Sequence, residues 1–202
     1  MAPSSPAVND HPAHDFVPAA IVASILIILA GLVVPFLRTC EREAAERRAR
    51  EDLVAIRRAI GDFMRDVGLP PTRDRDGHDR ALLRLNGKGP IPEGAYCLIG
   101  EPLQGDFRNH LFLNEPGGPG KPGYDGWRGP YLHRVDSDPW GNAYIVVAYP
   151  LNLSDGRQCI VISAGPNGRM DADYSSPRDP IPAGDDLIEV ISATSSRGRG
   201  ER

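Results

Sequence analysis

The residues with the greatest capacity for chemistry lie in an oxygen-rich segment near the C-terminal end of the chain. This segment, residues 163–186, reads SAGPNGRMDADYSSPRDPIPAGDD. Its hard oxygen ligands come from Asn167, Asp171, Asp173, Asp179, Asp185 and Asp186. Calcium prefers carboxylates and free carbonyls in a flexible frame, although the ligand spacing of an EF-hand is missing here. A calcium site and a solvated acidic loop are therefore both open on residue types alone.

Other motifs that could be reactive lack the setting that their chemistry requires. Ser163 lies in VISAG, which resembles a nucleophile elbow but lacks the first glycine and is followed by no helical pattern. Residues 117–123, GGPGKPG, contain a GxGxxG spacing without the strand and helix of a dinucleotide site. The five histidines are scattered along the chain. The sequence therefore predicts no enzyme.

The three cysteines, Cys40, Cys97 and Cys159, form no CxxC motif and have no neighbouring histidine pair, which argues against a zinc site. Cys97 and Cys159 both lie in strand-like segments. They could pair in an oxidising compartment, or they could be two small buried apolar residues. The sequence leaves both interpretations open.

The charge of the chain argues against a nucleic-acid partner. The formal net charge is -4, and the arginine-rich segments are interleaved with acidic residues. Binding to phosphate backbones requires a basic face. We therefore expect no nucleic acid among its partners.

Three strand-like segments surround the oxygen-rich segment and predict a small antiparallel sheet. They are AYIVVAYPL from Ala143, QCIVISA from Gln158 and DLIEVIS from Asp186, each bounded by turn residues. Residues 69–125 contain only short apolar pieces between polar loops. A sheet of this kind needs a cover on its apolar face, which a helix can provide.

The N-terminal part of the chain predicts a membrane span. Residues Phe16 to Leu37 form an uncharged block of 22 residues, long enough as a helix to cross a hydrocarbon core of about 30 Å. A cleaved secretory signal is disfavoured, because no basic residue precedes the block. Arginines follow it at Arg38 and Arg42, so the positive-inside rule alone places the following chain in the cytoplasm.

An amphipathic helix continues directly from this block, over residues 38–68. Its apolar stripe consists of Leu53, Ile56, Ile60, Phe63, Met64 and Val67. Gly68 and the following LPP end the helical pattern. The stripe lies near the C-terminal end of the helix, so we expect the globular part to pack there.

A set of motifs in a fixed order resembles the G-type pseudopilins of type II secretion systems. The motifs are LVVPFL in the apolar helix, then GPYL, DPWGNAY, SAGPNG and a DD pair followed by apolar residues. The resemblance covers Val17 to about Ser192. It implies an α+β, pilin-like fold in which the long N-terminal helix packs on a small antiparallel sheet, followed by a loop-rich C-terminal part.

The resemblance also implies a structural turn and a calcium site. In the family a Trp-Gly turn precedes the first strand of the sheet, so Asp138 and Pro139 would set the turn and Trp140 would pack. Gly141 and Asn142 suit positive φ. The implied metal ligands are the side chains of Asp185, Asp186 and Asn167 and the carbonyls of Ala164 and Arg169, with Asp171 or Asp173 as a further ligand.

The family further implies a division of the chain, a location and partners. The expected parts are a leader or cytoplasmic segment (1–15), the span (16–37), the amphipathic helix (38–68), a globular domain (69–192) and a disordered tail (193–202). The expected location is the inner membrane, crossed once, with the C-terminal domain outside the cytoplasm. The expected partners are other pseudopilins, secretion-machinery membrane proteins and further copies of the chain in a filament.

The chain departs from the family at its leader. The family has Gly before the Phe that follows the leader, and Glu four residues after that Phe. Here Asp15 precedes Phe16, and Ala20 stands at the Glu position. A filament subunit and a membrane-anchored binding module that does not polymerise therefore both remain as hypotheses.

Overall fold

The computed structural model describes residues 16–74, 76–78, 80, 83–95, 103, 105–133, 136–148, 158–174 and 181–191. The chain divides into two compact units, Met1–Ala44 and Ala45–Arg202, which we describe separately. The expected leader (1–15) and tail (193–202) lie outside the described residues, as do Cys97 and Asp179. The pairing of Cys97 with the buried Cys159 therefore stays a prediction.

Helix α1 (Phe16–Val67) joins the predicted span and the predicted amphipathic helix in one element. It continues through Pro35 without a break. In the first unit its apolar side chains are exposed, from 44% for Val34 to 72% for Ile27. By length and composition, α1 is apolar enough to cross a membrane.

The C-terminal end of α1 is set by glycine, as predicted. Gly68 follows the last helical residue with a φ of 79°, and its N–H donates to the carbonyl of Met64 at 2.9 Å. Only glycine adopts this left-handed conformation without strain, and the bond satisfies a carbonyl that the helix leaves open. The chain then turns back toward the sheet.

The second unit contains a five-stranded sheet in the order β2-β1-β3-β4-β5. Its strands are β1 (Leu83–Asn86), β2 (Gly105–Asp106), β3 (Ile145–Ala148), β4 (Cys159–Ser163) and β5 (Leu187–Ile191). Strands β3, β4 and β5 are the three predicted ones, and β1, β3, β4 and β5 pair antiparallel, as expected. The short β2 pairs parallel to β1, so the sheet as a whole is mixed.

Residues 69–125 are more ordered than the sequence indicates. They supply β1, β2 and the short helix α3 (Arg108–Leu111). Strand β1 pairs residue by residue with β3, from Leu83 opposite Ala148 to Asn86 opposite Ile145. A four-residue strand carries little periodicity of its own, which is why only its pairing with β3 reveals it.

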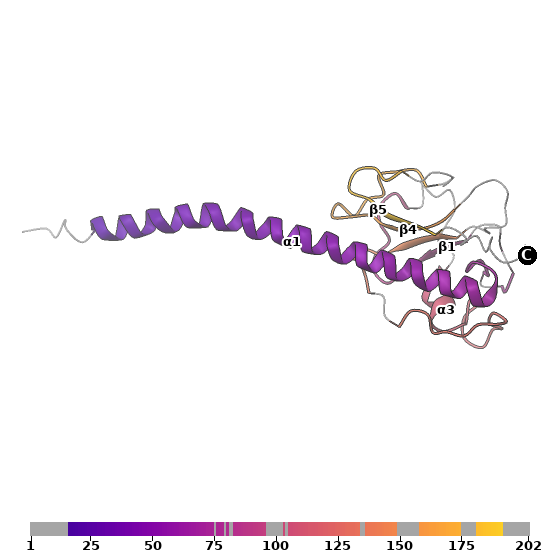
Figure 1. Ribbon diagram of the computed structural model, residues 1–202. Coiled ribbons are helices and arrows are strands. Elements are labelled where there is room, and N and C mark those ends of the chain that lie inside the picture. Colours follow the sequence, from indigo (N-terminus) through magenta and orange to yellow (C-terminus); the bar gives the residue numbers. More distant parts are fainter. Residues whose placement is uncertain are drawn as a thin grey trace, which may run out of the picture. The chain divides into compact units, whose positions relative to one another are not determined.

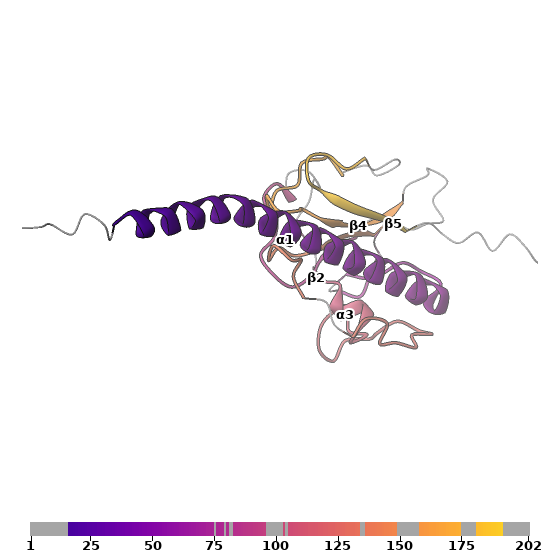
Figure 2. The ribbon, with the colours of Figure 1, turned by 60° about the vertical axis from the view of Figure 1, so that its left-hand side comes forward.

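The two faces of the sheet are buried under different elements. Tyr144, Val146 and Ala148 lie in one cluster with the stripe of α1, as the predicted cover requires (Figure 1). The alternate residues of β3, with Ile160 and Ile162, lie in a second cluster. That cluster is completed by Ala164, Met170, Ala172 and Tyr174, so the oxygen-rich segment covers the second face. Figure 2 shows β4 and β5 from another side.

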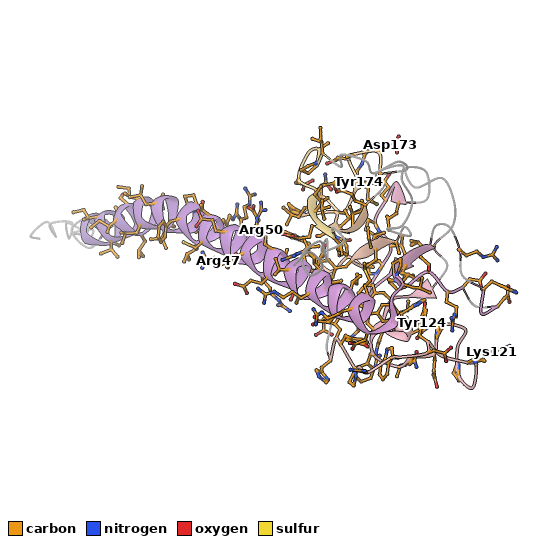
Figure 3. All side chains as sticks on the ribbon, turned by 45° about the vertical axis from the view of Figure 1, so that its right-hand side comes forward. Arg47, Arg50, Lys121, Tyr124, Asp173 and Tyr174 are labelled. Carbon is orange, nitrogen blue, oxygen red and sulfur yellow. The ribbon has the colours of Figure 1, made fainter. Side chains whose placement is uncertain are left out.

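A buried histidine lies on the α1 side of this core. His110 is 2% exposed, and its Nδ1 is 2.8 Å from the hydroxyl of Tyr124. Figure 3 labels Tyr124. That hydroxyl also accepts the N–H of Arg73 at 3.0 Å. Burial, and to a smaller extent the charge of Arg73, lower the pKa of His110 to about 3. The folded protein therefore holds a neutral imidazole.

We expect acid to destabilise the second unit through His110. The folded pKa lies below the unfolded one, so the stability is complete above pH 6.5 and is lost as the pH falls toward 3. Within this window the contribution is about 1.4 kcal/mol per pH unit. Urea unfolding at several pH values measures this slope, which His110→Gln removes. An unchanged slope in His110→Gln contradicts the prediction.

Candidate cation-binding loop

The turn at residues 138–142 is built around a buried carboxylate. Asp138 is 3% exposed, and its Oδ1 accepts the N–H groups of Trp140 at 3.1 Å and Asn142 at 2.8 Å. Gly141 takes the expected positive φ, at 96°. Asn142 does not adopt a positive φ, so that expectation was wrong; its side chain reaches toward the carbonyl of Gly165, at 3.5 Å. Trp140 packs against the core cluster under α1, as expected.

Ser163 is part of this turn's support and is not placed as a nucleophile. It is fully buried, and its hydroxyl donates to Asp138 Oδ2 at 2.7 Å. Ser163 Oγ also accepts the N–H of Gly165 at 3.3 Å. The motifs DPWGNAY and SAGPNG, which are separate in sequence, are thus joined through one carboxylate and one hydroxyl.

The segment from Gly165 to Met170 is held on its other side by a backbone ladder. Glu93 donates its N–H to the carbonyl of Gly168 and accepts the N–H of Met170, both at 2.9 Å. Bonds on both sides leave this segment little freedom to rearrange. Arg169, an expected carbonyl ligand, lies in this bridged segment, and Ala164 is buried where it begins.

Asn167 links two of the predicted acidic residues. Its N–H donates to Asp185 Oδ2 and its side-chain amide donates to Asp171 Oδ2, both at 2.9 Å. Its own Oδ1 accepts the N–H of Arg169 at 2.6 Å. Asp173 is exposed. The structure therefore brings together Asn167, Asp171 and Asp185.

Two glycines allow this close approach. Gly165 and Gly184 have φ values of 65° and 59°. A Cβ atom at Gly165 would overlap the backbone of Asp185, and one at Gly184 would overlap the carboxylate of Asp171. Only glycine combines the left-handed conformation with room for the neighbouring group.

Asp186 is the most buried acid of the loop, at 4% exposed. Its Oδ2 accepts three donors: the N–H groups of Asp171 at 2.9 Å and Ala172 at 3.1 Å, and the hydroxyl of Tyr174 at 2.9 Å. Burial raises the pKa of Asp186 above its usual value, and the nearby charge of Asp171 acts in the same direction. A positive charge at this position would offset both effects.

The acidic pair leaves two oxygen atoms buried without a hydrogen-bond partner. They are Oδ1 of Asp185 and Oδ1 of Asp186. Orphaned buried carboxylate oxygens are costly unless a donor or a cation satisfies them, so these residues fit a bound cation. Within the described part of the chain, His, Cys, Asp and Glu form no group of three or more that could hold a metal. A cation here needs carbonyl oxygens as well, which are ligands that calcium accepts.

Sequence reasoning missed Tyr174, Ser163 and Asp138 as supports of the loop. Tyr174 is fully buried and directly follows the acidic residues (Figure 3). Its position directly after Asp171 and Asp173 was the available signal, because its contact with Asp186 spans twelve residues. Asp138 was assigned to a turn alone, although it also receives Ser163 across 25 residues.

The chain is similar to curated proteins of type II secretion. It is 27% identical to type II secretion system core protein G of Escherichia coli K12 over 150 residues, which are 74% of this chain and 78% of the relative. An aligned range of 150 residues includes more than one of the motifs described above. The chain is thus similar to core protein G over most of its length. The corresponding protein of Vibrio cholerae O1 is also 27% identical over 124 residues.

The similarity to these two proteins covers different shares of their lengths. The match covers 61% of this chain and 62% of the length of the Vibrio cholerae protein. No protein-family model matches the chain. No solved structure matches it either. The long helix α1, whose C-terminal half packs on a small sheet, agrees with the expected pilin-like α+β fold.

Proposed function

We propose that the chain is a structural pseudopilin subunit of a type II secretion-type envelope filament that acts in protein secretion. The observation that carries the proposal is helix α1 in a chain similar to core protein G. Its first part is apolar and exposed, whereas residues such as Leu53 and Phe63 are buried in the core of the second unit. An exposed apolar helix of this length requires lipid or other apolar helices around it.

The proposed location is the inner membrane, crossed once, with the second unit outside the cytoplasm. The apolar segment supports the single crossing. Arg38 and Arg42 follow the segment and favour the opposite orientation under the positive-inside rule. Protease digestion of spheroplasts tests the orientation: the proposal expects cleavage of the second unit without lysis, and protection until lysis contradicts it.

The proposed partners are other pseudopilins, membrane proteins of the secretion machinery and further copies of the chain. A membrane-anchored pilin-fold binding module that does not polymerise is the second candidate function. The absence of the family's Glu at Ala20, and of Gly before Phe16, favours this second candidate. In the filament core a carboxylate at that position would be a specific contact between subunits.

Cross-linking at the native Cys40 separates the two candidates. Cys40 is exposed on α1 just after the apolar segment. A ladder beyond the dimer needs two reactive cysteines in each chain, so we add a second exposed one on α1 with Arg42→Cys. Treating membranes that contain this variant with a short bis-maleimide should give a ladder if the chain forms a filament. Cys40→Ser in the same variant is the control and should reduce the ladder to dimers. Monomers and dimers alone, with an uncleaved N-terminus by intact mass, would establish the anchored module instead.

We also propose that the oxygen-rich loop binds calcium. Oδ1 of Asp185 and Oδ1 of Asp186 would be ligands, together with the carbonyls of Ala164 and Arg169 and a further oxygen from Asn167, Asp171 or Asp173. The two orphaned oxygens support this assignment. Bound calcium would neutralise the acidic cluster and fix the cover over the second face of the sheet.

Calcium should stabilise the full chain in detergent relative to the chelated protein. At a calcium concentration about 100 times the dissociation constant, binding to the folded state adds about 2.7 kcal/mol of stability. Thermal unfolding with calcium, with magnesium and with chelator measures the effect, and Asp186→Asn serves as the control without a complete site. A melting temperature that calcium does not change would overturn the calcium proposal.

A further inference from the structure

The two carboxylate oxygens of Asp186 have opposite surroundings. Three donors converge on Oδ2, whereas Oδ1 is buried and has no hydrogen-bond partner. A carboxylate that receives three donors on one oxygen is restrained in rotation about its side-chain bonds. Oδ1 therefore also points in one fixed direction.

Of the three donors, only the tyrosine hydroxyl comes from a side chain. The other two are the backbone N–H groups of Asp171 and Ala172, in the same segment of the chain. Tyr174 is fully buried, and its ring packs in the cluster on the second face of the sheet. Its hydroxyl therefore ties the carboxylate of Asp186 to this packed cluster.

Packing alone does not explain a tyrosine at this position. Phenylalanine would fill the same space without a buried hydroxyl, which requires a partner. The hydroxyl meets this requirement by donating to Asp186. The hydroxyl donates to Oδ2, which already accepts two N–H groups, so Oδ1 stays open to another ligand.

We propose that Tyr174 is a positioning residue for the cation: by holding Oδ2 of Asp186, it directs Oδ1 into the cation site. The inference rests on the calcium site proposed above. Outer partners that orient a metal ligand in this way typically change metal affinity about 10- to 100-fold when they are lost.

The chain offers a matched control in Tyr144. This side chain is also fully buried, and its hydroxyl donates to the carboxylate of Asp52 at 3.0 Å, close to the 2.9 Å between Tyr174 and Asp186. Tyr144 lies in the cluster under α1, on the other face of the sheet. Tyr144→Phe and Tyr174→Phe therefore remove the same kind of hydrogen bond from opposite faces.

Calorimetric titration of calcium into the full chain in detergent tests the proposal. We expect Tyr174→Phe to raise the dissociation constant about tenfold, the lower end of the range for such outer partners. Tyr144→Phe should leave the constant unchanged. Thermal unfolding in chelator reports the structural effect of each substitution separately, and both variants should lose a similar amount of stability.

Each result has a separate meaning. Wild-type protein that binds no calcium overturns the calcium site itself. Wild-type binding with an unchanged constant in Tyr174→Phe overturns the positioning role alone. Equal weakening in both variants also overturns it, because the effect would then be general destabilisation.

A second measurement covers the case in which Tyr174→Phe does not fold. Site-specific incorporation of 3-fluorotyrosine at position 174 keeps the hydroxyl and adds a fluorine reporter. Its signal should shift on calcium addition and saturate with the calorimetric curve, whereas the same label at position 144 should not respond. No shift at position 174 in calcium-binding protein contradicts the proposal.

Discussion

Phe63→Ala is expected to lower the free energy of unfolding of the second unit by about 3 to 5 kcal/mol. Phe63 is fully buried at the centre of the apolar stripe of α1. Its ring meets Tyr124 edge to face at 4.9 Å between centroids and Tyr131 at 5.7 Å. Alanine removes these contacts and leaves a cavity that rigid aromatic neighbours cannot fill.

Urea unfolding of the full chain in detergent, followed by tryptophan fluorescence, measures this effect. Trp127 packs against Tyr131 and donates to the carbonyl of His110, so its emission reports the region around Phe63. Arg65→Ala is the control, because Arg65 is exposed and pairs only with Asp62 on the surface of the same helix turn. Its loss should cost less than about 0.5 kcal/mol. If Phe63→Ala and Arg65→Ala lowered the free energy of unfolding equally, the side chain of Phe63 would not stabilise the core, and the prediction would be wrong.

Asp138→Ala is expected to destabilise the second unit by about 3 kcal/mol or more. The carboxylate is buried and satisfies three donors: the N–H groups of Trp140 and Asn142 and the hydroxyl of Ser163. Alanine leaves these groups without an acceptor away from water. The turn ahead of β3 and the start of the oxygen-rich loop should loosen together.

Two milder substitutions separate the contribution of the Ser163 hydroxyl from that of the two N–H groups to this loss of stability. Asp138→Asn keeps an oxygen for the two N–H groups but not a second acceptor for Ser163, and Ser163→Ala removes only the hydroxyl. Each should cost about 1 to 3 kcal/mol, with a sum that differs from the double variant because the groups are in contact. Asp136→Ala is the control, since Asp136 pairs with Lys88 at the surface across 3.4 Å. The prediction is wrong if Asp138→Ala costs no more than this control.

Local patterns were sufficient for the helix and for three strands. The uncharged block from Phe16 and the stripe through Leu53 and Phe63 predict α1 because helical periodicity is a property of neighbouring residues. Strands β3, β4 and β5 are short apolar runs between turn residues. Every residue of β3 and β4 is buried, which suits such runs, whereas β5 is buried only at its two ends. These features required no knowledge of long-range contacts.

Features that depend on distant pairing were not accessible in this way. Strand β2 has only two residues and exists through its parallel register with β1, from Leu85 opposite Gly105. The sheet is therefore mixed where the local pattern indicated antiparallel pairing throughout. The second cover of the sheet was also missed, because Met170 and Tyr174 lie in a segment that reads as polar.

By itself, the sequence determined the long apolar and amphipathic helix, the order of the main strands, the glycine that ends α1 and the acidic composition of the loop. Each follows from side-chain spacing or from the conformational preference of a single residue. Only the tertiary structure decided the role of Ser163 beside Asp138 and of Tyr174 beside Asp186. Hydrogen bonds across 25 and 12 residues depend on how the turn, the loop and the sheet pack, and no local pattern encodes that geometry.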